Sequence, residues 1–301
     1  MQTGQKIYGV FAAVLTPLND DFSIQMEALP DLLRFLAQRG CHGALLFGTT
    51  GEGPSFSSEE RCQVFQMVPD LRKDLPDFML LGGTGTPSLD DTIRLTRAAF
   101  EFGLDGVVVL PPYYFRGATE EGLFTWYEQV IRKSVPGDGL LFGYHIPAIT
   151  GVSLSIDLLA RLKDAFPKQF GGLKDSSGEL EFSHQLDQRF GEALIVLTGN
   201  DGLFGQALEK HASGCITAMA NLYSPLLREV WDHFHSGKLY DQAQEKLIAI
   251  RNILSAYAPN ASILKAVLPH LHNLPAWPVR PPLTPTRLDF VEKALEELAA
   301  V

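Results

Sequence analysis

Cysteine is scarce in this 301-residue sequence, and its few cysteines stand far apart. Cys41, Cys62 and Cys215 are odd in number, and no two of them form a Cys-x-x-Cys pair. Neither a disulfide framework nor a thiolate metal site is therefore indicated. We expect each cysteine to be a small, buried, apolar side chain.

Long apolar runs and an excess of basic residues are also missing. No apolar run reaches the length of a membrane span, and residues 1–8 lack the basic and apolar regions of a secretory signal. The formal net charge of -10 argues against nucleic-acid or anionic membrane partners. We therefore expect a cytoplasmic protein that binds neither nucleic acids nor membranes.

What the sequence does contain is a regular alternation of apolar strands and amphipathic helices over residues 1–236. The expected strands are Val10–Leu15, Gly43–Phe47, Phe78–Gly82, Gly106–Leu110, Leu140–Tyr144, Phe170–Lys174, Leu194–Leu197 and Gly214–Met219. Eight such units predict an α/β protein with a closed (β/α)8 TIM barrel, because doubly wound sheets usually have fewer strands. Residues 237–301 predict a C-terminal helical appendage, interrupted by a proline-rich break at 274–285.

The carboxyl ends of the strands form the catalytic face of such a barrel. In this sequence these ends are rich in hydroxyl groups and hold one amine: Thr49, Thr50, Thr84, Tyr113, Tyr114, Tyr144, Lys174, Asn200, Asp201 and residues 216–221. They include no cluster of histidines or carboxylates of the kind that binds a catalytic metal, so no metal is expected.

Lys174 is the residue on which the functional interpretation depends. It ends an apolar strand and precedes an Asp-Ser-Ser-Gly turn. Burial there would favour the neutral amine, which is the nucleophile for Schiff-base formation with a ketone. Tyr144, one strand away, can carry protons if nearby positive charge lowers its pKa. Thr49 and Thr50 lie in a glycine-flanked turn that suits a carboxylate, so a 2-oxo acid is the expected substrate.

Each of these residues also has a purely structural interpretation. Lys174 could be a surface lysine on a loop, and the Thr49-Thr50 turn could serve only to cap a helix. Tyr144 could be a half-buried strand residue, Tyr114 could pack at an oligomer contact, and Asp201 could cap the following helix. Their joint placement on one face of one barrel favours the catalytic interpretation.

Several segments, taken in order, resemble the dihydrodipicolinate synthase / N-acetylneuraminate lyase superfamily of class I Schiff-base aldolases. The resemblance covers nearly the whole chain. It rests on Thr16-Pro17, Gly48–Glu52, Pro112–Tyr114, Tyr144–Pro147, Gly172–Gly178, Gly199–Asp201 and Gly214–Ile216.

The resemblance implies a role for individual residues. Lys174 matches the lysine that forms the imine, so no other cofactor is implied, and Tyr144 matches the proton-relay tyrosine. Thr49 and Thr50 match the pair that binds the carboxylate of the 2-oxo acid, with Thr49 also in the relay.

Two further positions match residues that contact pyruvate or a partner subunit. Tyr114 matches a tyrosine that some members insert into a neighbouring subunit's site. Ile216 matches the position whose backbone carbonyl faces bound pyruvate. Family members are usually tetramers built as dimers of dimers, so a homotetramer is implied.

The sequence departs from the family pattern where a second substrate would bind. Ile149 stands where dihydrodipicolinate synthases carry an arginine that holds the aldehyde substrate's carboxylate, and isoleucine cannot replace that fork. Asp201-Gly202 and Ala218 replace an Asp-Glu pair and a serine of the sialic-acid lyases, which leaves Asp201 as a hydroxyl contact. His145 replaces the usual asparagine, and the sequence suggests no role for it.

The expected function is therefore a pyruvate or 2-oxo-acid lyase, either an aldolase or a dehydratase, that works through Lys174. One alternative is a dihydrodipicolinate synthase (4-hydroxy-tetrahydrodipicolinate synthase) that condenses pyruvate with aspartate semialdehyde. An alternative of another class is a non-catalytic barrel that binds a keto acid.

Overall fold

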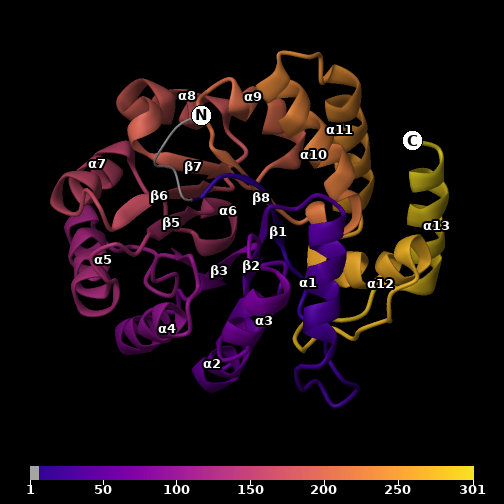
Figure 1. Ribbon diagram of the computed structural model, residues 1–301, viewed down its shortest axis with the longest axis horizontal. Helices are drawn as coiled ribbons and strands as arrows, with labels where there is room; N and C mark the ends of the chain where they lie inside the picture. The colour runs from indigo at the N-terminus through magenta and orange to yellow at the C-terminus, as the bar shows by residue number, and fades with distance from the viewer. Residues whose placement is uncertain (1–6) are drawn as a thin grey trace.

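Eight parallel strands close into a barrel in the computed structural model, which describes residues 7–301 (Figure 1). The strands are β1 (Gly9–Ala13), β2 (Gly43–Leu46), β3 (Met79–Gly83), β4 (Gly106–Val109), β5 (Leu141–His145), β6 (Phe170–Asp175), β7 (Ile195–Thr198) and β8 (Gly214–Thr217). Each strand pairs with the next one along the chain, and β8 pairs with β1. The predicted (β/α)8 barrel is confirmed.

Helices surround the barrel, as Figure 1 shows. They are α1 (Ala28–Gln38), η1 (Gly53–Ser55), α2 (Ser58–Phe65), α3 (Val68–Asp74), α4 (Leu89–Glu101), α5 (Glu120–Ser134), α6 (Pro147–Thr150), α7 (Ile156–Ala165), α8 (Leu180–Phe190), η2 (Gly191–Ala193), η3 (Asp201–Leu203), α9 (Phe204–Leu208) and α10 (Ala220–Ser236). Helix α7 illustrates their construction. The Ser155 hydroxyl accepts a hydrogen bond from the Leu158 amide and caps the helix, while Leu158, Leu159 and Leu162 are buried.

The buried apolar residues form two clusters, one on each side of the barrel wall. The inner cluster fills the barrel and includes Phe11, Leu45, Leu81, Phe142 and Ile216. The outer cluster lies between the strands and the surrounding helices. Because each strand is buried on both faces, its sequence is almost continuously apolar, which explains why the strands could be found without an alternating pattern.

Three helices follow the barrel: α11 (Asp241–Ser255), α12 (Asn260–His272) and α13 (Leu288–Ala299). Figure 1 shows α12 and α13 outside the ring, beyond α1 and α10. Helix α12 packs on α10, and α13 packs on α11 and α12. Within residues 7–301, no helix has the length and apolar character needed to cross a membrane.

Candidate active site

Tyr144 and Lys174 lie side by side because β5 and β6 pair in register. Their Cα atoms are partners in that pairing, so both side chains emerge on the same side of the barrel wall. Both residues are buried, and Lys174 Nζ lies 4.1 Å from the centroid of the Tyr144 ring. On its other side, β6 pairs with β7. Gly172 makes room for this pairing because it has no side chain: a Cβ there would lie 1.8 Å from the Ile195 carbonyl oxygen.

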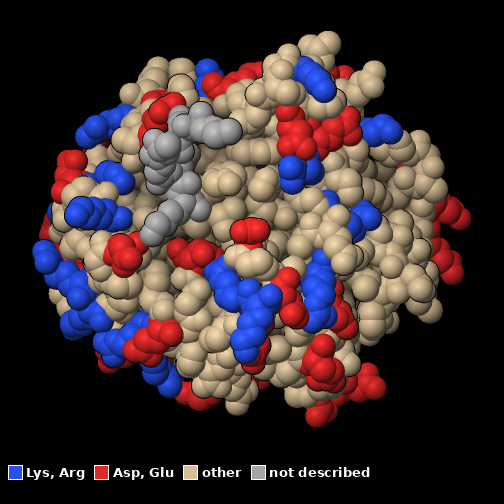
Figure 2. All heavy atoms as spheres, in the orientation of Figure 1, with Lys and Arg blue, Asp and Glu red and all other residues tan. Residues whose placement is uncertain are grey.

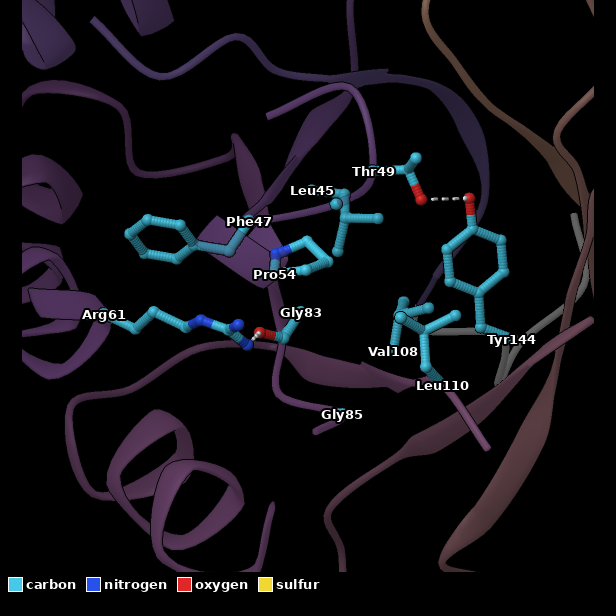
Figure 3. A pocket seen from close by; sticks show the side chains of 11 residues that line it. Leu45, Phe47, Thr49, Pro54, Arg61, Gly83, Gly85, Val108, Leu110 and Tyr144 are labelled. Carbon is cyan, nitrogen blue, oxygen red and sulfur yellow. Dashed lines mark hydrogen bonds between the residues drawn. The ribbon is translucent and has the colours of Figure 1, made fainter. Parts of the chain in front are cut away.

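The Tyr144 hydroxyl lies 3.3 Å from Thr49 Oγ1, a hydrogen bond that Figure 3 shows. Burial alone would raise the pKa of the Tyr144 phenol. The Lys174 charge and hydrogen bonds with Thr49, Lys174 and Ser176 outweigh burial, so that the pKa lies below its usual value. The direction matches the sequence prediction. Ser176 was anticipated only as part of a turn, because a hydroxyl in Asp-Ser-Ser-Gly carries no sequence signal for its contact with Tyr144.

Thr49 and Thr50 occupy the loop between β2 and η1. The loop closes on itself, because the Glu52 amide donates to the Thr49 carbonyl and the Gly53 amide donates to the Gly48 carbonyl. Thr50 is buried and Thr49 is half-buried. Two hydroxyls in one tight turn at the mouth of the barrel can hold a small anionic group.

A small cavity of about 10 Å³, enough for one water molecule, lies beside Thr49 and Tyr144 (Figure 3). Its wall includes Arg61, whose guanidinium donates to the Gly53 and Gly83 carbonyls. Burial lowers the pKa of Arg61 to about 10. The sequence suggested no such role, because an arginine flanked by glutamates near a helix start is typical of a solvated surface.

The remaining predicted residues lie in three different environments. Ile216 is buried in the inner cluster that also contains Tyr144, whereas Tyr114 is 77% exposed and its ring contacts Phe115 edge-on. Asp201 is fully buried, and its carboxylate lies 2.6 Å from Arg251 Nη1 of α11. Burial raises the pKa of Asp201 despite this charge. The structure thus brings Lys174, Tyr144 and Thr49 into one contact group, and it gives Asp201 a partner from the C-terminal helices.

The structure accounts for His145, to which the sequence assigned no role. His145 Nδ1 accepts a hydrogen bond from the Leu154 amide at 3.0 Å, and its ring stacks on Phe182. Burial lowers the pKa of His145 to about 4, which keeps the ring neutral and able to accept. An asparagine side-chain oxygen could accept the same hydrogen bond.

Ile149 lies on α6 with 58% of its surface exposed. Figure 2 shows acidic and basic side chains interspersed over the face in view. Within residues 7–301, no group of three or more His, Cys, Asp or Glu side chains is arranged to hold a metal ion.

Comparison with known proteins identifies the family of the chain. A model of the dihydrodipicolinate synthetase family matches residues 6–300. The chain belongs to this family. An uncharacterized DapA-like lyase of Chloroflexus aurantiacus is 39% identical over 92% of this chain and 91% of its own. A 4-hydroxy-tetrahydrodipicolinate synthase of Methanothrix thermoacetophila is 31% identical over 92% of this chain and 91% of its own.

The dihydrodipicolinate synthetase family also supplies structures with the same fold. YagE of Escherichia coli K12, solved in complex with pyruvate, superimposes with a TM-score of 0.91 at 23% identity, over 98% of this chain and 99% of its own. The resemblance recognised in the sequence is therefore confirmed. The expected function is confirmed to the extent that the protein is a lyase of this family.

Proposed function

We propose that the protein is a class I lyase that acts on pyruvate, or on a larger 2-oxo acid, through a Schiff base on Lys174. The observation that carries the proposal is the contact group in which buried Lys174 lies against Tyr144 and the Tyr144 hydroxyl meets Thr49. A nucleophilic amine, a proton carrier with a lowered pKa and a carboxylate-binding turn are the parts that imine chemistry requires. The imine forms on the lysine itself, so the reaction needs no metal and no other cofactor.

The steps follow from these groups. The neutral Lys174 amine adds to the ketone carbon and gives a carbinolamine, which loses water to form the imine. A proton then leaves the adjacent carbon, and the electron pair gives an enamine. Tyr144 delivers the proton that the departing water needs and receives protons from the amine, while Thr49 and Thr50 hold the carboxylate. The enamine forms a carbon–carbon bond with an aldehyde, or arises when such a bond breaks, or expels a hydroxyl group as water.

Two of the family's other features belong to the same proposal. The backbone carbonyl of Ile216 faces the bound 2-oxo acid. Tyr114, which is exposed in the single chain, reaches into the site of a partner in a homotetramer built as a dimer of dimers. Asp201 is the further expected contact for a hydroxyl group of the second substrate, through the oxygen that Arg251 does not bind.

The test is to incubate the protein with pyruvate and borohydride and to measure the intact mass. One reduced pyruvyl group per chain is expected, located on Lys174 by peptide mapping. If wild-type protein gains no mass, or if Lys174→Ala gains as much as wild type, the Schiff-base proposal is wrong. An adduct without turnover of any 2-oxo acid would favour a non-catalytic keto-acid-binding barrel.

A second candidate reaction is the condensation of pyruvate with aspartate semialdehyde. The 31% identity to a 4-hydroxy-tetrahydrodipicolinate synthase favours it, and an exposed isoleucine at position 149 argues against it. A screen of this pair against 2-keto-3-deoxy acids, 4-hydroxy-2-oxoglutarate and sialic acid separates the reactions. Robust condensation with aspartate semialdehyde would select the synthase.

A further inference from the structure

The loop that carries Thr49 and Thr50 is bordered by two residues in an unusual conformation. Phe47 and Glu52 both have left-handed backbone angles, with φ of 56° and 57°. Side chains other than glycine rarely adopt this conformation, and it persists where surrounding contacts enforce it. The contacts of Glu52 therefore decide the position of the loop.

The Glu52 carboxylate is buried and is held by the C-terminal part of the chain. Its Oε1 lies 2.5 Å from Lys265 Nζ of α12, and both side chains are almost fully buried. Its Oε2 accepts a hydrogen bond from the Arg280 amide at 2.7 Å. Lys265 Nζ also donates to the Pro278 carbonyl at 2.8 Å, which ties α12 to the extended segment that follows it. Both carboxylate oxygens are thus bound by residues outside the barrel strands.

The Arg280 side chain fixes the chain that follows the loop. Its guanidinium forms two hydrogen bonds with Glu60 of α2 and one with the Ser55 carbonyl, and it lies over the Phe56 ring. A planar guanidinium with several bonded donors restrains orientation as well as position. The loop and the start of α2 are therefore held by one segment, residues 265–280.

The loop transmits this restraint to the threonines because it is internally bonded. The Glu52 amide donates to the Thr49 carbonyl, and the Gly51 carbonyl accepts from Thr16 Oγ1. At Gly53 a Cβ would lie 2.0 Å from the Phe47 carbonyl oxygen, so the turn has no room to relax. A shift of Glu52 would move Thr49, and with it the partner of the Tyr144 hydroxyl.

We infer that Lys265 and Glu52 are positioning residues, and that the segment 265–280 holds the Thr49-Thr50 loop in its carboxylate-binding position. The inference rests on the proposed function for the identity of the ligand. Neither residue touches the substrate, and their effect is on where the threonine hydroxyls and amides stand. The C-terminal helical region therefore contributes to the active site by positioning this loop.

The test compares Lys265→Met with wild type and with Arg72→Met. Arg72 is bound to Asp105 and to the Phe78 carbonyl, so Arg72→Met, like Lys265→Met, breaks an ion pair, in this case a partly buried one. Arg72 lies near the start of β3, however, which is at the end of the barrel opposite the catalytic face. Two measurements are made at a temperature where circular dichroism shows all variants folded. One is hydrogen exchange of amides 47–56, and the other is the pyruvate concentration that gives half-maximal borohydride trapping.

The expected results separate positioning from stability. Lys265→Met should speed exchange across amides 47–56 and raise half-saturating pyruvate by about tenfold or more, with a smaller fall in the trapping rate at saturation. Arg72→Met should change neither. If Lys265→Met does not fold, the double variant Lys265→Met/Glu52→Gln, which leaves no buried unpaired carboxylate, takes its place and should show the same changes.

Two results overturn the inference: exchange of amides 47–56 equal to wild type, or half-saturating pyruvate equal to wild type. Absence of trapping in wild type overturns the proposed function instead. The exchange measurement still decides whether residues 265–280 position the loop, because it needs no ligand.

Discussion

Two lysines of this protein are equally buried, yet their surroundings differ. Lys174 and Lys265 are each 2% exposed. Lys265 lies against the Glu52 carboxylate and the Pro278 carbonyl. Lys174 lies against the Tyr144 ring and, among the described residues, forms no ion pair with a carboxylate. One amine is bound by a carboxylate and a carbonyl, and the other lies against a phenol.

The difference shows how the same side chain can serve structure or chemistry. Burial lowers the pKa of Lys265, and the Glu52 carboxylate opposes that shift by stabilising the ammonium. A lysine with such a partner cannot easily become a nucleophile. Among the described residues Lys174 has no carboxylate partner, and it lies against the phenol that the proposed imine chemistry uses. Four predictions test this contrast.

The largest expected effect is on catalysis by Lys174. Lys174→Ala should lower turnover of a 2-oxo acid by at least about 1,000-fold, because it removes the amine that lies against the Tyr144 ring. Lys163→Ala is the matched control, since Lys163 binds the Phe170 carbonyl where the same strand begins. Steady-state kinetics with both variants decide the point. Comparable activity in Lys174→Ala and the control would rule out the catalytic role.

The second prediction concerns the free energy of unfolding, to which Lys265 should contribute more than Lys174. Lys265→Met should lower the free energy of unfolding by about 3–5 kcal/mol, because it leaves the Glu52 carboxylate buried and unpaired. Lys174→Met should change it by about 1 kcal/mol or less, because no carboxylate is left behind. Urea titration of both variants measures the difference. Equal losses would show that the two surroundings are energetically alike.

The third prediction concerns the Tyr144 phenol, which lies beside Lys174. Tyr144→Phe should keep pyruvate binding but slow turnover by about 100-fold, because the proton carrier is lost. Tyr127→Phe removes another buried hydroxyl, one bound to the Val109 carbonyl, and should leave turnover unchanged. Pre-steady-state trapping and turnover rates are compared for both. Unchanged turnover in Tyr144→Phe would refute the relay.

The smallest expected effect concerns a buried base that the fold keeps neutral. Burial lowers the pKa of His145 from its ordinary value of 6.5 to about 4, so below about pH 6.5 the unfolded chain binds a proton that the folded chain does not. Wild-type stability should therefore fall as the pH drops from 6.5 towards 4, by at most about 1.4 kcal/mol per pH unit from this residue.

His145→Asn should weaken that dependence, because an asparagine oxygen can accept from the Leu154 amide without titrating. His270→Asn, at an exposed site, is the control and should follow wild type. Urea midpoints measured from pH 7 to pH 4.5 test both. An identical pH dependence in His145→Asn and wild type would contradict the assignment.

The barrel and the residues at its candidate catalytic end could be predicted because both depend on short segments. Strands buried on two faces are almost wholly apolar, so their number and order were visible without any knowledge of pairing. The position of Lys174 at the end of such a strand followed directly. Helix α6 was not predicted, since four residues that start with Pro147 carry no helical periodicity.

Contacts between distant segments could not be predicted in the same way. Asp201 was expected to face a substrate hydroxyl, and its pairing with Arg251, 50 residues further along, was not anticipated. Glu52 was recognised only as part of a motif, and its partner Lys265 is 213 residues away. A charged residue in a turn or on a helix gives no local sign that it is buried, because burial depends on what packs over it.

The sequence by itself determined the eight βα units, the lysine at the end of the sixth strand and the hydroxyl groups at the ends of neighbouring strands. Each of these features depends only on residues that are close together in the sequence. Only the tertiary structure decided which lysine received a carboxylate. The register of β5 and β6 placed Lys174 against Tyr144, and the packing of α12 brought Lys265 to Glu52. Proximity in space, rather than the type of side chain, separates the proposed nucleophile from the lysine that is paired with a carboxylate.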